Sequence, residues 1–324
     1  MTPLLEVRDL RVSFPVGEGR TIHPVDGVSF ALERGRTLAL VGESGCGKSL
    51  TGLALLRLVP MPGRVEPSSV IRLDGEELMT FDEEAMRSVR GGRIGMVFQD
   101  PMTSLNPVLT IGDQIAEAVR AHRKVSKSEA LARAESLLAE VGIADPARRL
   151  GEYPHQLSGG MRQRVMIAIA LAAEPEILIA DEPTTALDVT VQAQILELLD
   201  RLRTQRGMAV LLITHDLGVV AGRADDMCVM YAGQIVERAS TRQVFEAPAH
   251  PYTRGLFGSV PTITGPRERL TPIAGSVPPP TAWPTGCRFA PRCPERFARC
   301  DTMPSLRRAG PGHESRCWLT GDEP

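Results

Sequence analysis

The stretch Leu157–Asp188 reads LSGGMRQRVMIAIALAAEPEILIADEPTTALD, and the rest of the chain is best understood from it. Ser158 and two glycines stand in front of a run with the pattern of a helix. The middle of the stretch, Ile177–Ala180, predicts a short buried strand that ends in Asp181 and Glu182. Carboxylates at the end of a buried strand are costly unless a cation or a reaction needs them. We therefore expect a functional site at this strand end.

A glycine-rich loop upstream supplies a second part of that site. GESGCGKS, residues 42–49, follows the apolar run Thr37–Val41 and precedes a predicted helix, Leu50–Leu58. This matches G-x-x-x-x-G-K-S in its strand–loop–helix setting, where backbone N–H groups and the helix N-terminus bind phosphates. Lys48 is expected to reach the outer phosphates and Ser49 to ligate Mg²⁺. The expected nucleotide-binding residues of the loop are Gly42, Ser44, Gly45, Gly47, Lys48 and Ser49.

Three other residues become candidates through this context. Phe14 ends a predicted strand, residues 4–14, and is either a core aromatic or a stacking surface for adenine. Gln99 follows the predicted strand Arg93–Phe98 and could hold a water or Mg²⁺ near the γ-phosphate. His215 follows the apolar run Ala209–Thr214. It could be a structural histidine, but in a chain with this loop we expect it to reach the γ-phosphate.

Composition excludes several classes of protein. The net charge is -2 and the pI about 6.3, so no global field favours nucleic acid. No apolar run reaches the roughly 18 residues that cross a bilayer. The start, MTPLLEVRDL, lacks the basic and apolar regions of a signal peptide. These features predict a cytoplasmic chain, in which disulfides are rare.

The order of patterns predicts the organisation of the chain. Residues 15–24 are expected to form a hairpin loop before a return strand that begins at Val28. Residues 111–150 have helical periodicity, and their outer face could dock a partner or simply complete a structural bundle. The runs 227–231 and 234–238 predict a hairpin. After residue 240 frequent prolines, among them Pro261, Pro266 and Pro272, break regular structure.

Taken together and in order, these motifs resemble the ATP-binding cassette (ABC) ATPase family over residues 4 to about 238. The LSGGMRQ element is the most specific part, because many NTPases share the glycine-rich loop. The HPYT segment, residues 250–253, and the region GCRFAPRCPERFARC are similar to the C-terminal extension of the oligopeptide/dipeptide-importer subfamily. Members of that subfamily power peptide permeases and, in some relatives, nickel importers.

The resemblance implies an α/β fold. It would comprise a RecA-like P-loop ATPase core, an antiparallel β-subdomain and a helical subdomain at about residues 100–160, all within residues 1–238, and a cysteine-containing extension at 239–324. The implied function is ATP hydrolysis that drives an importer of oligopeptides or dipeptides, with a nickel or other small-solute importer as the alternative.

The resemblance also implies partners and a location. They are a second ABC ATPase subunit (usually a paralogue, or a second copy), two integral membrane permease subunits and, indirectly, an extracytoplasmic solute-binding protein. No nucleic acid is implied, and the chain would be peripheral at the cytoplasmic face of the membrane. ATPases that act on DNA or ribosomes usually carry two cassettes or a long coiled coil, which this chain lacks. A redox sensor is the third hypothesis and rests only on the cysteines.

Family roles transfer to the matching positions. Lys48, Ser49 and the loop amides would hold ATP and Mg²⁺, and Asp181 would support Mg²⁺. Glu182 would polarise the attacking water, while Gln99 and His215 would contact the γ-phosphate end. The residues expected to act at the dimer seam, on ATP bound by the partner, are Ser158, Gly159, Gly160 and Asp188.

Four of the six cysteines gather near the C-terminus with the spacing C-x5-C-x6-C-x16-C. Clustered thiols in a cytosolic chain favour a metal over disulfides. The spacing is looser than the C-x2-C pairs of zinc sites, and four thiolates suit an iron–sulfur cluster; zinc and unligated thiols remain alternatives. The resemblance also points to a 4Fe-4S cluster. The expected ligands are Cys287, Cys293, Cys300 and Cys317, whereas His313 is expected at the surface of a glycine-rich turn, and Cys46 and Cys228 are not expected to be ligands.

Overall fold

The computed structural model describes the chain except residues 1, 18, 186, 260–272 and 322–324. Pro261, Pro266, Pro272 and Ala186 therefore lie outside the described residues. The chain divides into two compact units. Unit 1 contains Met1–Leu32, Thr37–Met79 and Ile213–Pro324, and unit 2 contains Glu33–Arg36 and Thr80–Leu212.

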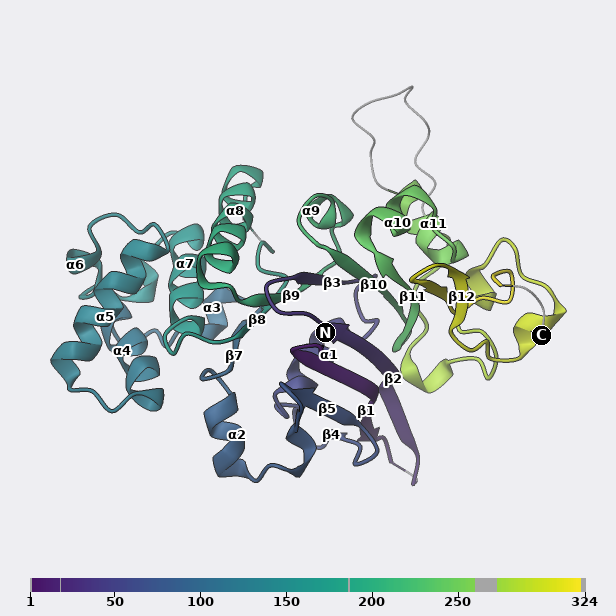
Figure 1. Ribbon diagram of the computed structural model, residues 1–324, viewed down its shortest axis with the longest axis horizontal. Helices are drawn as coiled ribbons and strands as arrows, with labels where there is room; N and C mark the ends of the chain where they lie inside the picture. The colour runs from purple at the N-terminus through teal and green to yellow at the C-terminus, as the bar shows by residue number, and fades with distance from the viewer. Residues whose placement is uncertain (1, 18, 186, 260–272, 322–324) are drawn as a thin grey trace. The chain divides into compact units, whose positions relative to one another are not determined.

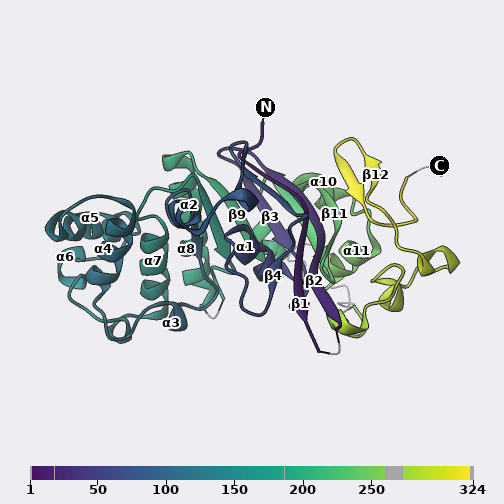
Figure 2. The ribbon, with the colours of Figure 1, turned by 90° about the horizontal axis from the view of Figure 1, so that it is seen from below.

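The first sheet of unit 1 is antiparallel, as the resemblance implies. Its strand order is β2-β1-β5-β6, and β4 pairs with β1. Figure 2 shows β1 and β2 as a long paired ribbon. The return strand begins well before Val28, so its predicted start was wrong; Gly27, at φ 76°, and polar neighbours hide the alternation there. The strands are β1 (Leu5–Pro15), β2 (Thr21–Leu32), β4 (Arg64–Val65), β5 (Val70–Leu73) and β6 (Glu76–Glu77).

The other strands of unit 1 connect the glycine-rich loop to the C-terminal extension at 239–324, called the tail below. β3 (Thr37–Val41) is fully buried and pairs in parallel with β10 (Asp226–Tyr231). β10 turns through Ala232 and Gly233, both at positive φ, into β11 (Gln234–Ser240), as expected for a tight hairpin. The hairpin predicted at 227–238 is thus confirmed.

The tail of unit 1 adds a hairpin that the sequence did not predict. β13 (His313–Ser315) pairs with β11 and with β12 (Arg307–Gly310), and Figure 1 shows this hairpin, in yellow, beside β11. Both strands are too short for a visible period. The helical elements of unit 1 are α1 (Lys48–Leu55), η1 (Leu78–Thr80, whose last residue lies in unit 2), α9 (Leu217–Val220), α10 (Thr241–Glu246), α11 (Pro251–Gly258), η3 (Pro280–Ala282), η4 (Ala290–Arg292) and η5 (Ala298–Asp301).

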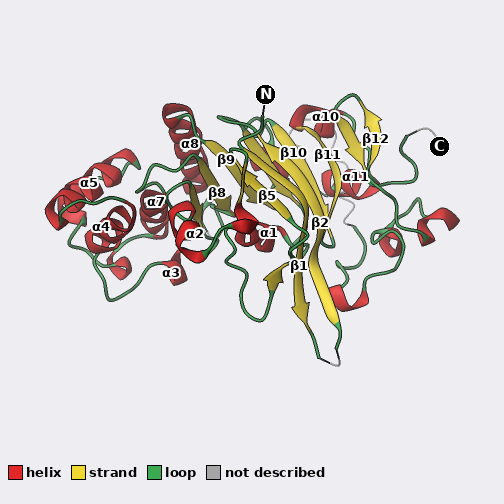
Figure 3. Ribbon diagram, turned by 60° about the horizontal axis from the view of Figure 1, so that its bottom comes forward, coloured by secondary structure: helices red, strands yellow, loops and turns green. Residues whose placement is uncertain are grey.

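Unit 2 contains parallel strands and most of the helices. β7 (Ile94–Val97) pairs in parallel with β8 (Ile177–Asp181), with Ile94 opposite Ile177. β9 (Ala209–Thr214) begins in this unit, and its last two residues belong to unit 1. Figure 3 separates the strands, in yellow, from the helices, in red. The helices of unit 2 are α2 (Glu83–Val89), α3 (Pro101–Ser104), α4 (Ile111–His122), α5 (Lys127–Glu140), α6 (Pro146–Arg149), η2 (Pro154–Gln156), α7 (Gly159–Ala170) and α8 (Val189–Arg206).

The predicted helical segment at 111–150 is confirmed. The Thr110 hydroxyl caps α4, and Ser126 begins α5 with a full capping box, so each start has a local cause. The apolar faces of the two helices are buried where they pack on each other. Among the described residues no helix is long and apolar enough to cross a membrane.

Candidate functional site

The glycine-rich loop of unit 1 has a backbone that only glycine can adopt at two points. A Cβ on Gly42, at φ 155°, would lie 2.2 Å from the carbonyl oxygen of Met230. A Cβ on Gly47, at φ 104°, would lie 2.6 Å from the carbonyl oxygen of Pro24. The chain therefore passes tightly between β10 and β2 and leaves its N–H groups at the start of α1.

Lys48 makes this loop a site for anions. The side chain is buried, and Nζ donates to the carbonyl oxygens of Gly42 (2.8 Å) and Glu43 (3.0 Å). No carboxylate of the described residues lies within ion-pair distance of Nζ, so the buried charge lacks a counter-ion. A polyphosphate would supply one. Ser49 follows Lys48 directly, half-buried at the second position of α1.

Cys46 lies inside the same loop but is not reactive. It is fully buried, and burial raises the pKa of its thiol although Lys48 acts in the opposite direction. A thiol with a raised pKa is a poor nucleophile and a poor ligand. Its sulfur would lie 2.9 Å from a Cβ on Gly42, which identifies Cys46 as packing beneath the loop.

The other two candidate residues of unit 1, Phe14 and His215, differ in their surroundings. Phe14 is half-buried and packs on the backbone of Gly63, where a Cβ would lie 2.3 Å from the ring. His215 is exposed directly after β9, and the next residue, Asp216, caps α9. Stacking of Phe14 on adenine and contact of His215 with the γ-phosphate stay predictions.

The acidic strand end of unit 2 brings two predicted residues together. Asp181 is the last residue of β8 and is buried. Glu182 follows at φ 44°, a conformation that costs a non-glycine residue roughly 1–3 kcal/mol and is typical of functional sites. Its Oε2 accepts hydrogen bonds from Gln99 Nε2 (3.0 Å) and from the Thr185 hydroxyl (3.0 Å). The half-buried carboxylate is thus oriented beside the exposed Gln99, as a group that positions a water must be.

The LSGG element forms the start of α7. The Ser158 hydroxyl accepts from Met161 N–H (3.3 Å) and the side chain is exposed. A Cβ on Gly160 would lie 2.7 Å from Val191 Cγ1, so α7 and α8 approach closely here. Asp188 caps α8 by accepting from Val191 N–H (2.9 Å). Ser158, Gly159 and Asp188 therefore share one exposed edge of unit 2.

The four tail cysteines are free thiols. Cys287 N–H donates to the Cys300 carbonyl (2.9 Å), and Cys317 Sγ accepts from Leu319 N–H (3.4 Å). Burial raises the pKa of Cys317 to about 11, and the other three thiols act in the same direction. Among the described residues no three His, Cys, Asp or Glu side chains form a group arranged for a metal ion. The predicted cluster is therefore not confirmed.

His313 is not the surface residue that the sequence suggested. It is buried, and Nε2 lies 2.7 Å from Oε1 of Glu237, itself fully buried on β11. Glu237 also accepts from Ala249 N–H (2.7 Å) and His250 N–H (2.8 Å). No pattern in the sequence marks this network, because Glu237 stands in a strand whose other face is also buried.

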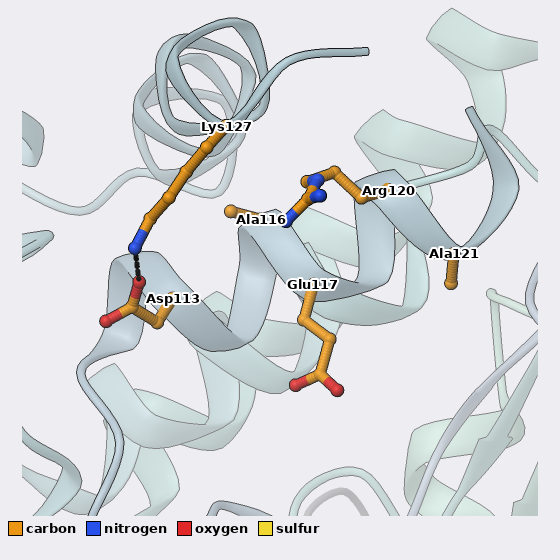
Figure 4. Close-up of a pocket in the computed structure, with 6 residues that line it drawn as sticks. All are labelled: Asp113, Ala116, Glu117, Arg120, Ala121 and Lys127. Atoms are coloured by element: carbon orange, nitrogen blue, oxygen red, sulfur yellow. Dashed lines mark ion pairs between the residues drawn. The ribbon is translucent and has the colours of Figure 1, made fainter. Parts of the chain in front are cut away.

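A surface pocket of unit 2 lies on α4 and the start of α5. Figure 4 shows the carboxylate of Asp113 paired with Lys127, whose Nζ is 3.1 Å away. Both charges are largely exposed, so this ion pair contributes little to selecting a ligand. Docking of a partner on the outer helical face stays a prediction. The residues lining the pocket are Asp113, Ala116, Glu117, Arg120, Ala121 and Lys127.

Comparisons with known proteins agree with this geometry. The family "ABC transporter" matches residues 25–185, and "Oligopeptide/dipeptide transporter, C-terminal region" matches residues 236–300. A "Probable peptide ABC transporter ATP-binding protein y4tR" of Sinorhizobium fredii is 52% identical over 98% of this chain and 96% of that protein. The "Oligopeptide transport ATP-binding protein AppD" of Bacillus subtilis is 51% identical over 100% of this chain and 98% of that protein.

Solved structures support the same fold. The dimeric post-hydrolysis state of the ATP-binding cassette MJ0796, bound to ADP and Pi, has a TM-score of 0.63 and 27% identity. It covers 74% of this chain and 99% of that one. With relatives above 50% identity along nearly its whole length, and with both matched regions in order, the chain belongs to the ATP-binding subunits of the oligopeptide/dipeptide ABC transporter family.

Proposed function

We propose that this chain is the ATP-hydrolysing motor subunit of an ABC importer for oligopeptides or dipeptides. The observation that carries the proposal is the buried ammonium of Lys48, held only by carbonyl oxygens in a loop shaped for phosphates. The match of residues 236–300 to the oligopeptide/dipeptide C-terminal region supports the class of cargo. The ATPase part is expected at residues 1–238, with a helical subdomain at about 100–160, and the extension at 239–324.

The chemistry rests on charge and position. Lys48 neutralises the outer phosphate oxygens, and the loop amides hold the rest of the chain of phosphates. Glu182 accepts hydrogen bonds from Gln99 and Thr185, so it keeps one orientation in which to polarise a water that attacks the γ-phosphate. The proton of that water passes to the carboxylate or to bulk water, and ADP and phosphate are released. Mg²⁺, held by Ser49 with support from Asp181, would neutralise charge on the β- and γ-phosphates.

A substitution at Glu182 tests this role. Glu182→Gln keeps shape and removes the basic carboxylate, so turnover should fall by at least a hundredfold while MgATP affinity is retained. Lys48→Met is the matched variant, because it should weaken binding itself. Near-normal hydrolysis by Glu182→Gln would refute the assignment.

The partners follow from the proposed function. We expect a second ATPase subunit, as a paralogue or a second copy, with Ser158, Gly159, Gly160 and Asp188 facing its nucleotide. Two membrane permease subunits would anchor the chain at the cytoplasmic face, and a solute-binding protein would act indirectly. Co-purification from native membranes tests this: recovery of integral membrane subunits supports it, and recovery of ribosomal RNA or DNA instead overturns it.

We further infer that the tail thiols bind an iron–sulfur cluster, with zinc as the alternative. The support is the donor chemistry, since four thiolates suit such a cluster; the described side chains do not themselves form a group arranged for a metal ion. Anaerobic purification with iron, sulfide and zinc analysis distinguishes the metals. Four thiols that all react freely in the native protein, with no metal present, would exclude the site. The ligands would be Cys287, Cys293, Cys300 and Cys317.

A further inference from the structure

An ion pair joins the cysteine-rich tail directly to the nucleotide loop within unit 1. The Arg292 guanidinium bonds the Glu43 carboxylate through both terminal nitrogens, Nη1 to Oε2 at 2.8 Å and Nη2 to Oε1 at 3.2 Å. The Arg292 side chain is only 7% exposed and that of Glu43 26%. A bidentate pair whose arginine is buried holds a fixed geometry, unlike a fully exposed pair.

The tail fixes Arg292 in place before it reaches the loop. Nε donates to the Ala274 carbonyl (2.8 Å) and Nη2 to the Gly275 carbonyl (3.2 Å). The short helix that carries it, η4, lies between two of the four thiols: Ala290 N–H donates to the Cys287 carbonyl (3.0 Å). Because Cys293 follows Arg292 directly, a movement of these cysteines would displace the guanidinium.

A second contact holds the main chain at the same loop residue. Glu43 N–H donates to the Tyr252 hydroxyl (2.9 Å). The ring of Tyr252 is buried and packs on Phe289, with centroids 5.4 Å apart, and on Tyr231, at 4.6 Å. Phe289 belongs to the same Cys287–Cys293 segment as Arg292. The tail therefore fixes both the backbone and the side chain of Glu43.

The charge of Glu43 indicates a function for its ion pair with Arg292. A carboxylate in a loop that binds polyphosphate repels its ligand unless a cation neutralises it. Lys48 cannot do so, because its Nζ bonds the carbonyl of Glu43 and not the carboxylate. We propose that Arg292 is a positioning residue that neutralises Glu43, so that the Cys287–Cys293 segment sets the affinity of the loop for MgATP. This inference rests on the proposed function and adds a regulatory input to it.

Two variants break the same contact with opposite effects on charge. Arg292→Met leaves Glu43 uncompensated and should weaken MgATP binding about tenfold, roughly the effect of one partly screened charge. Glu43→Gln leaves a positive charge at the loop and should retain or strengthen binding. Mere disruption of the loop would weaken binding in both. In the double variant, Arg292→Met with Glu43→Gln, affinity should return to within about threefold of the wild type.

The measurement is titration calorimetry of MgATP into the purified full-length chain, with Glu182→Gln included to prevent turnover. Arg296→Met is the matched control, because Arg296 makes a 2.9 Å pair with Asp301 in the same tail but at an exposed site. It should leave affinity unchanged. Tyr252→Phe removes only the hydroxyl that accepts Glu43 N–H, and should weaken binding by a few-fold. If Arg292→Met does not fold, the affinities of Glu43→Gln and Tyr252→Phe still test the positioning role.

The link to the thiols is tested by non-additivity. Cys293→Ser should weaken MgATP binding in the wild type but should have no further effect beside Arg292→Met. Equal weakening in both backgrounds would overturn the link, and unchanged affinity in Arg292→Met and Tyr252→Phe would overturn the positioning role. A wild-type chain that does not bind MgATP would instead overturn the proposed function.

Discussion

The buried carboxylate of Glu237 provides the most demanding test of how the tail is attached. We expect Glu237→Ala to destabilise the tail by about 4 kcal/mol. It would leave three donors without a partner: Ala249 N–H, His250 N–H and His313 Nε2. A buried donor without a partner costs roughly 1–3 kcal/mol; His250 and His313 are buried, and Ala249 is half-buried.

The same hairpin offers a matched control. Glu314 stands opposite Arg238 in the β11–β13 pairing and forms an ion pair with it, but their side chains are 37% and 34% exposed. Pairs of that kind contribute roughly 0–1 kcal/mol. Glu314→Ala should therefore cost less than about 1 kcal/mol, although it removes the same charge from an adjacent register position.

The assay follows from the placement of the tryptophans. The chain has two, Trp283 and Trp318, and both lie in the tail. Urea unfolding followed by their fluorescence therefore reports on the tail, and circular dichroism of the same samples reports on the whole chain. Equal shifts of the fluorescence midpoint for Glu237→Ala and Glu314→Ala would refute the reasoning, because burial would then not distinguish the two carboxylates.

Three further predictions concern backbone, protonation and assembly. Gly42→Ala should abolish MgATP binding and cost at least about 3 kcal/mol of stability, because its Cβ meets the carbonyl oxygen of Met230. Gly45→Ala, at φ 79° in open space, should cost only about 1–2 kcal/mol, and thermal unfolding measures both losses. Burial lowers the pKa of His250 to about 3, so between pH 6.5 and 3 the unfolded chain binds a proton at this histidine and the folded chain does not. The free energy of unfolding should therefore fall by about 1.4 kcal/mol per pH unit as the pH drops through that range, and His250→Asn should remove this slope in urea titrations. Ser158→Arg should block steady-state hydrolysis but leave MgATP affinity of the isolated chain unchanged, because the exposed serine is proposed to act on the partner's nucleotide.

Local sequence was sufficient where the cause of a structure lies within a few residues. The helix Val189–Arg206 has those bounds because Asp188 caps its start and Gly207, at φ 63°, ends it. The strand Ala209–Thr214 is equally well defined by a run of apolar residues buried on both faces. The glycine-rich loop belongs to the same class, since its geometry requires glycine at fixed spacing.

Contacts between distant segments could not be read in this way. Arg292 and Glu43 are 249 residues apart, and His313 and Glu237 are 76 apart. Neither pair has a period, a spacing or a cap that marks it. The glycine-rich surroundings of His313 even suggested a position at the surface. His313 is buried because it lies in a hairpin of two short strands, whose sequence patterns are too brief to detect.

The affinity of the nucleotide loop for MgATP is expected to depend on its backbone conformation and on the charge of Glu43, and ionic strength should distinguish the two effects. Gly45→Ala acts through backbone strain, which salt does not screen, so its affinity relative to the wild type should stay constant between 50 and 500 mM salt. Arg292→Met acts through the uncompensated charge of Glu43, and the Debye length falls from roughly 14 to 4 Å over that range. Its affinity relative to the wild type should therefore recover as salt rises. Because Glu43 is 26% exposed, screening ions can approach it. A salt-independent loss in Arg292→Met would show that the arginine acts by packing alone, and the tail would then control the shape of the loop but not its charge.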